Sequence, residues 1–205
     1  MSEPTVEFWQ ERFEADRTPW DRGEPGPQLS VWLGDGTLRP GQSICVPGCG
    51  SGHEVVALAA AGCAVAALDY APAAVELTRA RLRAAGLHAA VHQADVLTWQ
   101  PEAPFDAIYE QTCLCALYPD RWIDYASQLH AWLRPGGSLC ALFMQLRRDG
   151  AARGHVEGPP YHCDINAVRA LLPASRWDWP EPPYPVVPHP RGMTELAAVL
   201  TRRPD

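Results

Sequence analysis

Short apolar runs alternate with segments of helical periodicity along most of the chain. Apolar runs of the length of buried strands occur at residues 43–46, 64–68, 89–93, 105–110 and 138–146. Helical patterns lie between them at residues 53–61, 72–85 and 119–133. Strands and helices that alternate in this way form βαβ units. We therefore expect an α/β fold with a mostly parallel sheet and helices on both faces.

The N-terminal part departs from this alternation. Phe8, Trp9 and Phe13 fall near one face of a predicted helix. The prolines and glycines of residues 18–27 exclude regular structure after it.

The C-terminal part is also less regular. Residues 134–137 are predicted as a turn, 165–172 as a short helix and 196–201 as a last strand. The proline-rich residues 179–190 are predicted as a stiff surface loop between two strands, and a ligand for a proline-binding module is the alternative. No internal repeat occurs, so we expect one domain over residues 1–205.

Charge and hydropathy narrow the range of partners. The 205-residue chain has 24 acidic and 17 basic side chains and a net charge of -7, which disfavours binding to nucleic acid. It contains no apolar run of about 18 residues and no signal-peptide pattern at its start. We therefore expect a soluble cytoplasmic protein that binds neither membrane nor nucleic acid.

The cysteines are predicted to be reduced, packed thiols. There are seven of them, an odd number, and most lie inside apolar runs. Zinc is the alternative, but no C-x-x-C pair occurs and only His162 is next to a cysteine. We therefore expect no metal site.

A glycine-rich turn follows the first predicted strand. Gly48, Gly50 and Gly52 form a G-x-G-x-G pattern, which brings bare backbone close to a ligand at the start of a helix. Dinucleotide sites use G-x-G-x-x-G, and here His53 occupies the last glycine position. A tight strand-to-helix turn without a ligand is the alternative.

Two acids follow the next two predicted strands. Asp69 lies 17 residues beyond Gly52, where a carboxylate can accept both hydroxyls of a ribose. Asp95 could accept from the exocyclic amine of adenine. Helix capping is the alternative for both, and a solvated loop acid is a further one for Asp95. Ribose and adenine readers without a pyrophosphate site suit an adenosine compound such as S-adenosylmethionine.

Aromatic residues near the N-terminus support a cationic ligand. Trp9, Phe13 and Trp20 flank a segment rich in proline and glycine, and aromatic faces attract a sulfonium charge. Core packing of an amphipathic helix is the alternative, most of all for Phe13.

Five motifs occur in order along the chain: "TPWDRG" (18–23), "VPGCGSGHEVVALA" (46–59), "LDYAPAAVE" (68–76), "FDAIYEQTCLCAL" (105–117) and "LRPGG" (133–137). Together they resemble the thiopurine S-methyltransferase family of class I S-adenosylmethionine-dependent methyltransferases, and within it the thiol and halide methyltransferases. The resemblance implies a Rossmann-like, seven-stranded sheet whose last two strands form an antiparallel pair at one edge. It covers nearly the whole chain.

The resemblance also implies roles for individual residues. Its cofactor-binding residues would be Trp9, Phe13, Trp20, Gly48, Gly50, Asp69, Tyr70, Asp95, Val96 and Gln111. Gln111 stands where halide-methylating relatives have a tyrosine facing the nucleophile, which disfavours a halide and favours a soft thiol or a related chalcogen nucleophile.

The expected reaction is direct transfer of a methyl group from S-adenosylmethionine to a small soft nucleophile. Pocket walls are expected around Tyr161, along residues 111–115 and from an N-terminal lid within residues 1–40. Gln111, Tyr161 and Glu110 are the catalytic candidates, Glu110 as a weak base that could instead face water. Cys113 and Cys115 are interpreted as packed thiols. Alternatives are methylation of halide or of selenium and tellurium oxyanions, a nicotinamide-dependent oxidoreductase, and a non-catalytic adenosine-binding protein.

Overall fold

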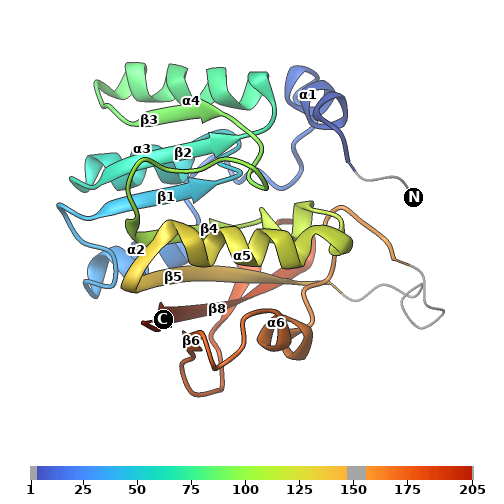
Figure 1. The fold of residues 1–205 in the computed structure, drawn as a ribbon. Helices are drawn as coiled ribbons and strands as arrows, with labels where there is room; N and C mark the ends of the chain where they lie inside the picture. The colour runs from blue at the N-terminus through green and yellow to red at the C-terminus, as the bar shows by residue number, and fades with distance from the viewer. Residues whose placement is uncertain (1–3, 147–155, 205) are drawn as a thin grey trace.

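The computed structural model describes residues 4–146 and 156–204, and their strands form a single sheet (Figure 1). The strands are β1 Ser43–Pro47, β2 Ala64–Asp69, β3 Ala90–Gln93, β4 Phe105–Gln111, β5 Leu133–Gln145, β6 Trp177–Asp178, β7 Val186–His189 and β8 Met193–Arg202. Their order is β3-β2-β1-β4-β5-β8-β6, with β7 also paired to β8. Strands β1 to β5 pair in parallel, whereas β8 is antiparallel to β5, β6 and β7. The predicted α/β, Rossmann-like sheet with an antiparallel edge is confirmed.

The strand at that edge is divided into two pieces. Strand β5 occupies one edge of β8 from Thr194 to Thr201. Strand β7 pairs with the first part of β8, and β6 pairs with its end. Both therefore lie on the other edge of β8, so eight strands fill seven positions.

The helices cover both faces of the sheet. They are α1 Val6–Glu14, α2 Pro27–Gly34, α3 His53–Ala60, α4 Pro72–Ala85, α5 Trp122–Trp132 and α6 Ile165–Leu171. Gly86 ends α4 in the left-handed conformation at φ 66°, which glycine adopts without strain. No described helix has both the length and the apolar character needed to cross a bilayer.

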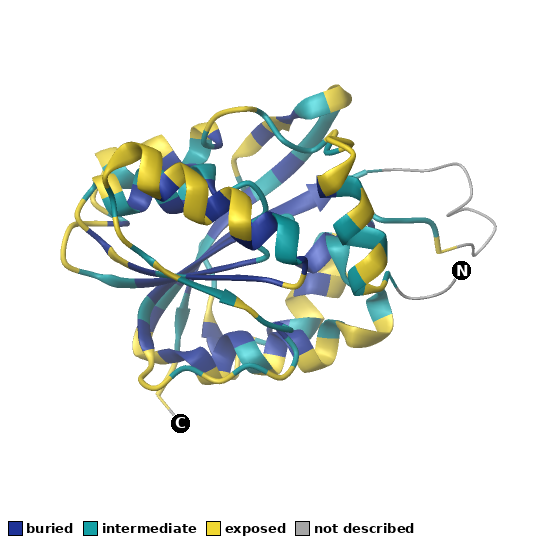
Figure 2. Cartoon of the chain, turned by 90° about the horizontal axis from the view of Figure 1, so that it is seen from above, coloured by how far each residue is buried: buried dark blue, intermediate teal, exposed yellow. Residues whose placement is uncertain are grey.

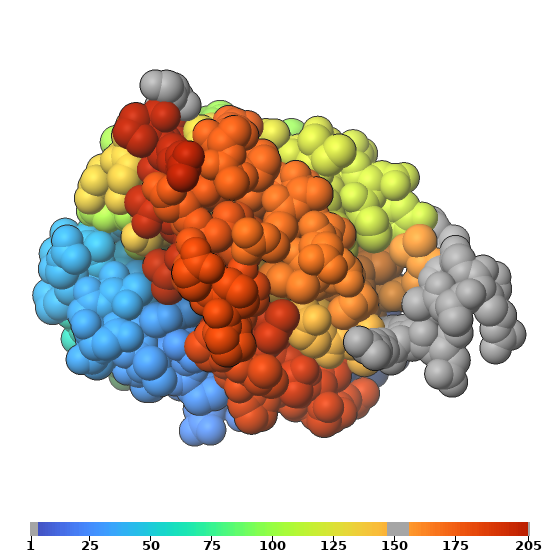
Figure 3. Space-filling model, turned by 90° about the horizontal axis from the view of Figure 1, so that it is seen from below, coloured from blue at the N-terminus to red at the C-terminus, as the bar shows by residue number. Residues whose placement is uncertain are grey.

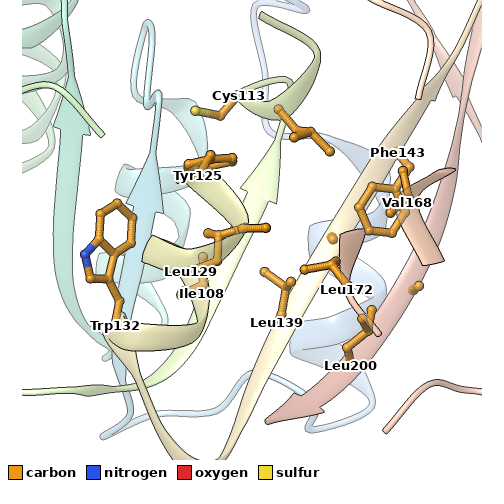
Figure 4. Close-up of a cluster of buried hydrophobic side chains, with 14 of the residues drawn as sticks. Ile108, Cys113, Tyr125, Leu129, Trp132, Leu139, Phe143, Val168, Leu172 and Leu200 are labelled. Carbon is orange, nitrogen blue, oxygen red and sulfur yellow. The ribbon is translucent and has the colours of Figure 1, made fainter. Parts of the chain in front are cut away.

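The hydrophobic core lies on both sides of the sheet because neighbouring strand residues point to opposite faces. Ile44 and Val46 pack with α2 and α3, whereas Cys45 packs on the face covered by α5 and α6. Buried strands accordingly lie between helices whose outer faces are exposed (Figure 2). The core on the second face is labelled in Figure 4 and includes Ile108, Tyr125, Leu129, Trp132, Leu139, Phe143, Val168, Leu172 and Leu200.

One helix was not predicted and two local predictions were wrong. The helix is α2, which begins at Pro27, where the missing N–H of proline is not needed. Residues 134–137 belong to β5, with a register irregularity opposite Phe105 and Ala107, rather than to a separate turn. The proline-rich segment 179–190 is not entirely a loop, because its last part forms β7 on the edge of the sheet, where proline is tolerated.

The C-terminal part of the chain covers the β8 edge. Viewed from below, it spreads in orange and red between the blue N-terminal part and the yellow-green α5 region (Figure 3). At the carboxyl ends of the parallel strands, α1 lies beyond the ends of β1 and β2, and the segment after β4 lies beside them (Figure 1). That end of the sheet is where ligands bind in open α/β folds.

Candidate active site

A cavity of about 1430 Å³ lies at the carboxyl ends of the parallel strands. Its wall comes from α1, residues 16–23, the glycine turn, the ends of β2 and β3, the segment after β4 and the β7–β8 hairpin. Of the predicted site residues, the cavity is lined by Trp9, Phe13, Trp20, Gly48, Gly50, Asp69, Tyr70, Asp95 and Val96. Gln111, Glu110 and Tyr161 are not among its lining residues.

The glycine turn both connects strand β1 tightly to helix α3 and places bare backbone at the cavity. Gly52 has φ 79°, and a Cβ there would lie 2.5 Å from the Thr78 hydroxyl of α4, so a side chain has no space. Gly52 therefore allows the tight turn into α3. Gly48 has φ 60° and lines the cavity, and a Cβ there would lie 3.1 Å from Cys113 Sγ. Bare backbone at Gly48 thus keeps this part of the cavity open.

Asp69 connects the glycine turn to the start of α4. Its Oδ2 accepts from the Gly50 amide at 2.8 Å, and its Oδ1 accepts from the Ala71 amide at 2.9 Å. The residue is 7% exposed, and burial raises the pKa of its carboxyl despite these hydrogen bonds. The Tyr70 amide also favours the ionised carboxylate, and a carboxylate has about four lone pairs, so the group can accept a further hydrogen bond at the cavity wall.

Asp95 organises the turn after β3 and also lines the cavity. Its Oδ1 accepts from the Leu97 amide at 2.8 Å, and its backbone carbonyl accepts from Thr98 and Trp99. Asp95 can therefore stabilise this turn and also contact a ligand in the cavity. Val96, 7% exposed, lines the cavity beside it.

The three N-terminal aromatic residues form one cluster at the cavity. The Trp20 ring lies edge-to-face with Trp9 at 5.5 Å and with Phe13 at 6.0 Å between centroids. Phe13 is buried against Ala71 and Ala74, so core packing explains much of its placement. Trp9 and Trp20 are only half-buried, which leaves part of their surface to the cavity.

The segment after α1 is attached to the sheet by two charged residues whose roles were not predicted. Asp21 accepts from the Ser51 hydroxyl and lies 3.1 Å from His53 Nε2. Burial acts against ionisation of Asp21, but hydrogen bonds from Ser51 and Gly23 and the nearby His53 hold its pKa below the ordinary value. Arg22 donates to the Pro188 carbonyl, so this segment reaches both the glycine turn and β7.

Gln111 and Glu110 lie behind the cavity wall. Gln111 donates to Glu195 Oε2 at 2.9 Å, accepts from the Tyr109 hydroxyl at 2.7 Å and lines only a smaller pocket of about 70 Å³. Glu110 is 1% exposed, accepts from the Leu114 amide at 2.7 Å and has a pKa raised by burial to about 7. The alternative that Glu110 faces water is therefore wrong.

The backbone after β4 explains these two placements. Thr112 has φ 64°, a conformation that β-branched residues rarely adopt, and it turns the chain toward the cavity. Thr112, Cys113 and Cys115 consequently line the cavity in place of the two strand residues. Both thiols are nevertheless buried, and burial raises their pKa values well above the ordinary value, as expected for packed cysteines.

Tyr161 also lies outside the cavity lining. It is 2% exposed, its ring packs edge-on against Tyr118 at 5.7 Å, and its amide donates to the Cys115 carbonyl. The two residues before it, Pro159 and Pro160, line the cavity. The segment around Tyr161 thus contributes to the cavity wall through these two prolines, and a catalytic role for Tyr161 stays a prediction.

Comparison with known proteins agrees with this arrangement. Residues 4–179 match the family described as thiopurine S-methyltransferase (TPMT). The chain is 33% identical over 175 residues to probable thiol methyltransferase 2 of Arabidopsis thaliana, covering 84% of this chain and 74% of that protein. It is 32% identical over 166 residues to thiocyanate methyltransferase 1 of the same plant, covering 80% and 70%.

The fold is shared more widely. A 1,6-didemethyltoxoflavin-N1-methyltransferase from Burkholderia thailandensis, solved with S-adenosylhomocysteine, superposes with a TM-score of 0.76 at 19% identity. The similarity covers 97% of this chain and 87% of that one. The predicted family resemblance is confirmed: the chain belongs to the thiopurine S-methyltransferase family of S-adenosylmethionine-dependent methyltransferases.

Proposed function

We propose that the protein transfers the methyl group of S-adenosylmethionine to the sulfur of a small thiol. The observation that carries the proposal is the cavity itself, which joins a polar end suited to a nucleoside to a wall rich in apolar and sulfur-containing side chains. The names of the thiol and thiocyanate methyltransferases among its relatives support the same chemistry.

The polar end has the groups that the nucleoside requires. Asp69 can accept a further hydrogen bond from the ribose hydroxyls, and Gly48 and Gly50 present backbone without side chains. Asp95 and Val96 would hold the adenine, the acid through its free lone pairs and the valine through apolar contact. These residues fit S-adenosylmethionine without requiring a pyrophosphate site.

The aromatic cluster would hold the methionine end. Trp9 and Trp20 have half-buried rings at the cavity, and a sulfonium near such rings gains up to about 2 kcal/mol when desolvated. Tyr70, 39% exposed, lines the cavity next to Asp69. When bound, S-adenosylmethionine supplies a methyl group attached to a positively charged sulfur.

The opposite wall would hold the nucleophile. It includes Cys115, Leu117, Met144 and Met193, which are apolar or weakly polar. Such a wall suits a soft sulfur nucleophile because it removes water from it, and correct positioning of the two reactants can contribute several kcal/mol, on the order of 7. No covalent intermediate on the protein is required.

The N-terminal segment would act as the predicted lid. Within residues 1–40, α2 contributes Leu29 and Trp32 to the core, so it cannot move without disrupting the sheet face. We therefore assign the lid to residues 4–26, which line the cavity and are held by Asp21 and Arg22. Closure of this segment would exclude water during the reaction.

We also infer that the substrate is a small molecule in the cytoplasm rather than a nucleic acid. The net charge of -7 opposes contact with phosphate backbones. Gel-shift titration at low salt should show no complex with DNA or RNA, and a stable complex would contradict this inference.

The proposed function is tested by a product screen with methyl-labelled S-adenosylmethionine. The panel contains small thiols, thiocyanate, iodide, selenite and tellurite, and products are identified by mass spectrometry. We expect labelled methyl thioethers as the main products, and calorimetry should detect S-adenosylhomocysteine but not NAD. Binding of S-adenosylhomocysteine with no methylated product from any nucleophile would support a non-catalytic binding protein instead.

A further inference from the structure

His189 lies at the tip of the β7–β8 hairpin. It is the last residue of β7 and pairs with Met193, the first residue of β8. Between them, Arg191 at φ 64° and Gly192 at φ 71° turn the chain within three residues. The strand pairing therefore holds the His189 backbone in place at the cavity.

The same residue stands where the two pockets meet. Both the large cavity and the small pocket are lined by Trp20, Asp21, Gly48, Gly50, Thr112 and His189. Under the proposed function, Trp20 and Gly48 mark the region of the charged sulfur of the methyl donor. His189 is thus close to the region where the nucleophile would approach.

Among the described residues, no side chain forms a hydrogen bond with the His189 ring. The residue is 5% exposed, and its Nδ1 is enclosed without a hydrogen-bond partner among the described residues. His189 lines both pockets, and Nε2 is the ring nitrogen farther from the backbone, so Nε2 is the nitrogen assigned to a ligand. Burial, and next the positive charge of Arg22, lower the pKa of His189 to about 4, so the ring is neutral at pH 7.

Three carboxyl groups near His189 already have partners. Asp21 pairs with Ser51 and His53 across the small pocket. Glu54, on the same pocket, accepts from the Gly26 amide. On β8, Glu195 accepts from Gln111 and faces Arg22.

We propose that His189 is the general base of the reaction and that its Nε2 accepts the proton of a neutral thiol substrate. This inference rests on the proposed function. As the thiol sulfur forms its bond to the transferred methyl carbon, its proton moves to Nε2. The electron pair of the bond that breaks remains on the departing thioether sulfur, and the imidazolium then releases the proton to water.

A weakly basic imidazole is sufficient for this step. A free thiol has a pKa near 8.5, so most of it is protonated at pH 7. A methylated sulfur that still carried the proton would be a very strong acid. The proton becomes more acidic than the His189 imidazolium as the carbon–sulfur bond forms, so its transfer to Nε2 becomes favourable during the reaction.

The test compares two nucleophiles that differ in whether they must lose a proton. 2-Mercaptoethanol loses one on methylation, whereas thiocyanate has none to lose. We expect His189→Asn and His189→Gln, which retain a hydrogen-bonding group but no base, to lower kcat for 2-mercaptoethanol about 100-fold. The rate with thiocyanate and the affinity for S-adenosylhomocysteine should change less than about threefold.

The matched control is His130→Asn, because His130 is also buried, at 3% exposure, but lies on α5 outside both pockets. It should affect both nucleophiles equally. The deficit of the His189 variants should also shrink as the pH rises toward the pKa of 2-mercaptoethanol, where the thiol ionises without help. Equal losses for thiol and thiocyanate, or no loss for the thiol, would overturn the proposal.

A measurement without turnover separates this proposal from the proposed function. In the complex with S-adenosylhomocysteine at pH 7, the nitrogen NMR signal of His189 Nε2 should be that of an unprotonated nitrogen. A protonated Nε2 would contradict the assignment of the base, whatever the product screen shows. Failure of wild-type protein to methylate any nucleophile would instead contradict the proposed function.

Discussion

Arg22 Nη2 lies 3.9 Å from Glu195 Oε2, and this contact joins the N-terminal segment to the beginning of strand β8. The Glu195 side chain is fully buried, and that of Arg22 is 18% exposed. Gln111 donates to the same Glu195 oxygen at 2.9 Å. Burial raises the pKa of Glu195 to about 8, even though Gln111 and Arg22 favour its ionised form. Arg22 of the lid and Gln111 of the sheet therefore contact the same buried carboxyl group, that of Glu195.

Arg22→Ala is expected to loosen the lid without unfolding the sheet. The variant loses both the contact with Glu195 and the hydrogen bond to the Pro188 carbonyl. Amide hydrogen exchange should increase over residues 4–26, and affinity for S-adenosylhomocysteine should fall about tenfold, which corresponds to about 1.4 kcal/mol. Arg83→Ala, in the last turn of α4, is the control and should change neither. Unchanged exchange over residues 4–26 would show that Arg22 does not hold the lid.

Trp20→Ala and Trp32→Ala should separate ligand binding from folding. Trp20 is half-buried at the cavity, whereas Trp32 is 4% exposed and packs against Tyr109 in the core. Trp20→Ala should weaken S-adenosylhomocysteine binding and lower stability only slightly. Trp32→Ala should reduce the free energy of unfolding by about 3–5 kcal/mol and leave affinity unchanged in the folded fraction. The opposite pattern in melting and calorimetry would assign Trp20 to packing.

Glu110→Gln should change how stability depends on pH. Burial raises the pKa of Glu110 from 4.5 in the unfolded chain to about 7 in the folded protein. Between these values the folded state binds more protons, so this group's contribution to stability is present below pH 4.5 and is lost as pH rises through 7.

The neutral glutamine avoids this loss. The free energy of unfolding of Glu110→Gln, relative to wild type, should therefore increase from pH 5 to pH 8 by up to about 3 kcal/mol. Urea unfolding at both pH values provides the measurement. A constant difference between the two proteins would show that Glu110 is ionised throughout this range.

The elements of the sheet could be predicted from sequence because the signals were local. Strand β1 and helix α4 combine apolar runs with glycine or proline boundaries, and their predicted limits agree with the structure to within a residue. Asp69 and Gly48 could be placed at the site because carboxyl ends of neighbouring parallel strands meet at one edge.

The remaining features depend on contacts between distant segments. Gln111 and Glu110 were expected at the cavity, but the left-handed Thr112 turns the chain so that the following residues line it instead. His189 lay in a segment predicted as a loop, and only its pairing with β8 brings it to the cavity. Arg22 belongs to the motif at residues 18–23, but its partner Glu195 lies near the other end of the chain, so their contact could not be predicted from local sequence.

The central claim is that Asp69 holds the nucleoside of the cofactor, and two aspartates allow a matched comparison. Asp106 lies at the opposite end of β4, where its carboxylate accepts from Ser43 and Arg134 far from the cavity. Both Asp69→Ala and Asp106→Ala leave hydrogen-bonding groups unpaired and should cost about 1–3 kcal/mol of stability. Melting curves, together with Asp69→Asn as a milder variant, establish that the proteins are folded.

Calorimetric titration of the folded variants with S-adenosylhomocysteine tests the claim most directly. Asp69→Ala should bind at least about tenfold more weakly than wild type, a loss of about 1.4 kcal/mol or more, whereas Asp106→Ala should bind as wild type does. Wild-type affinity in Asp69→Ala would contradict the assignment of this carboxylate to the cofactor.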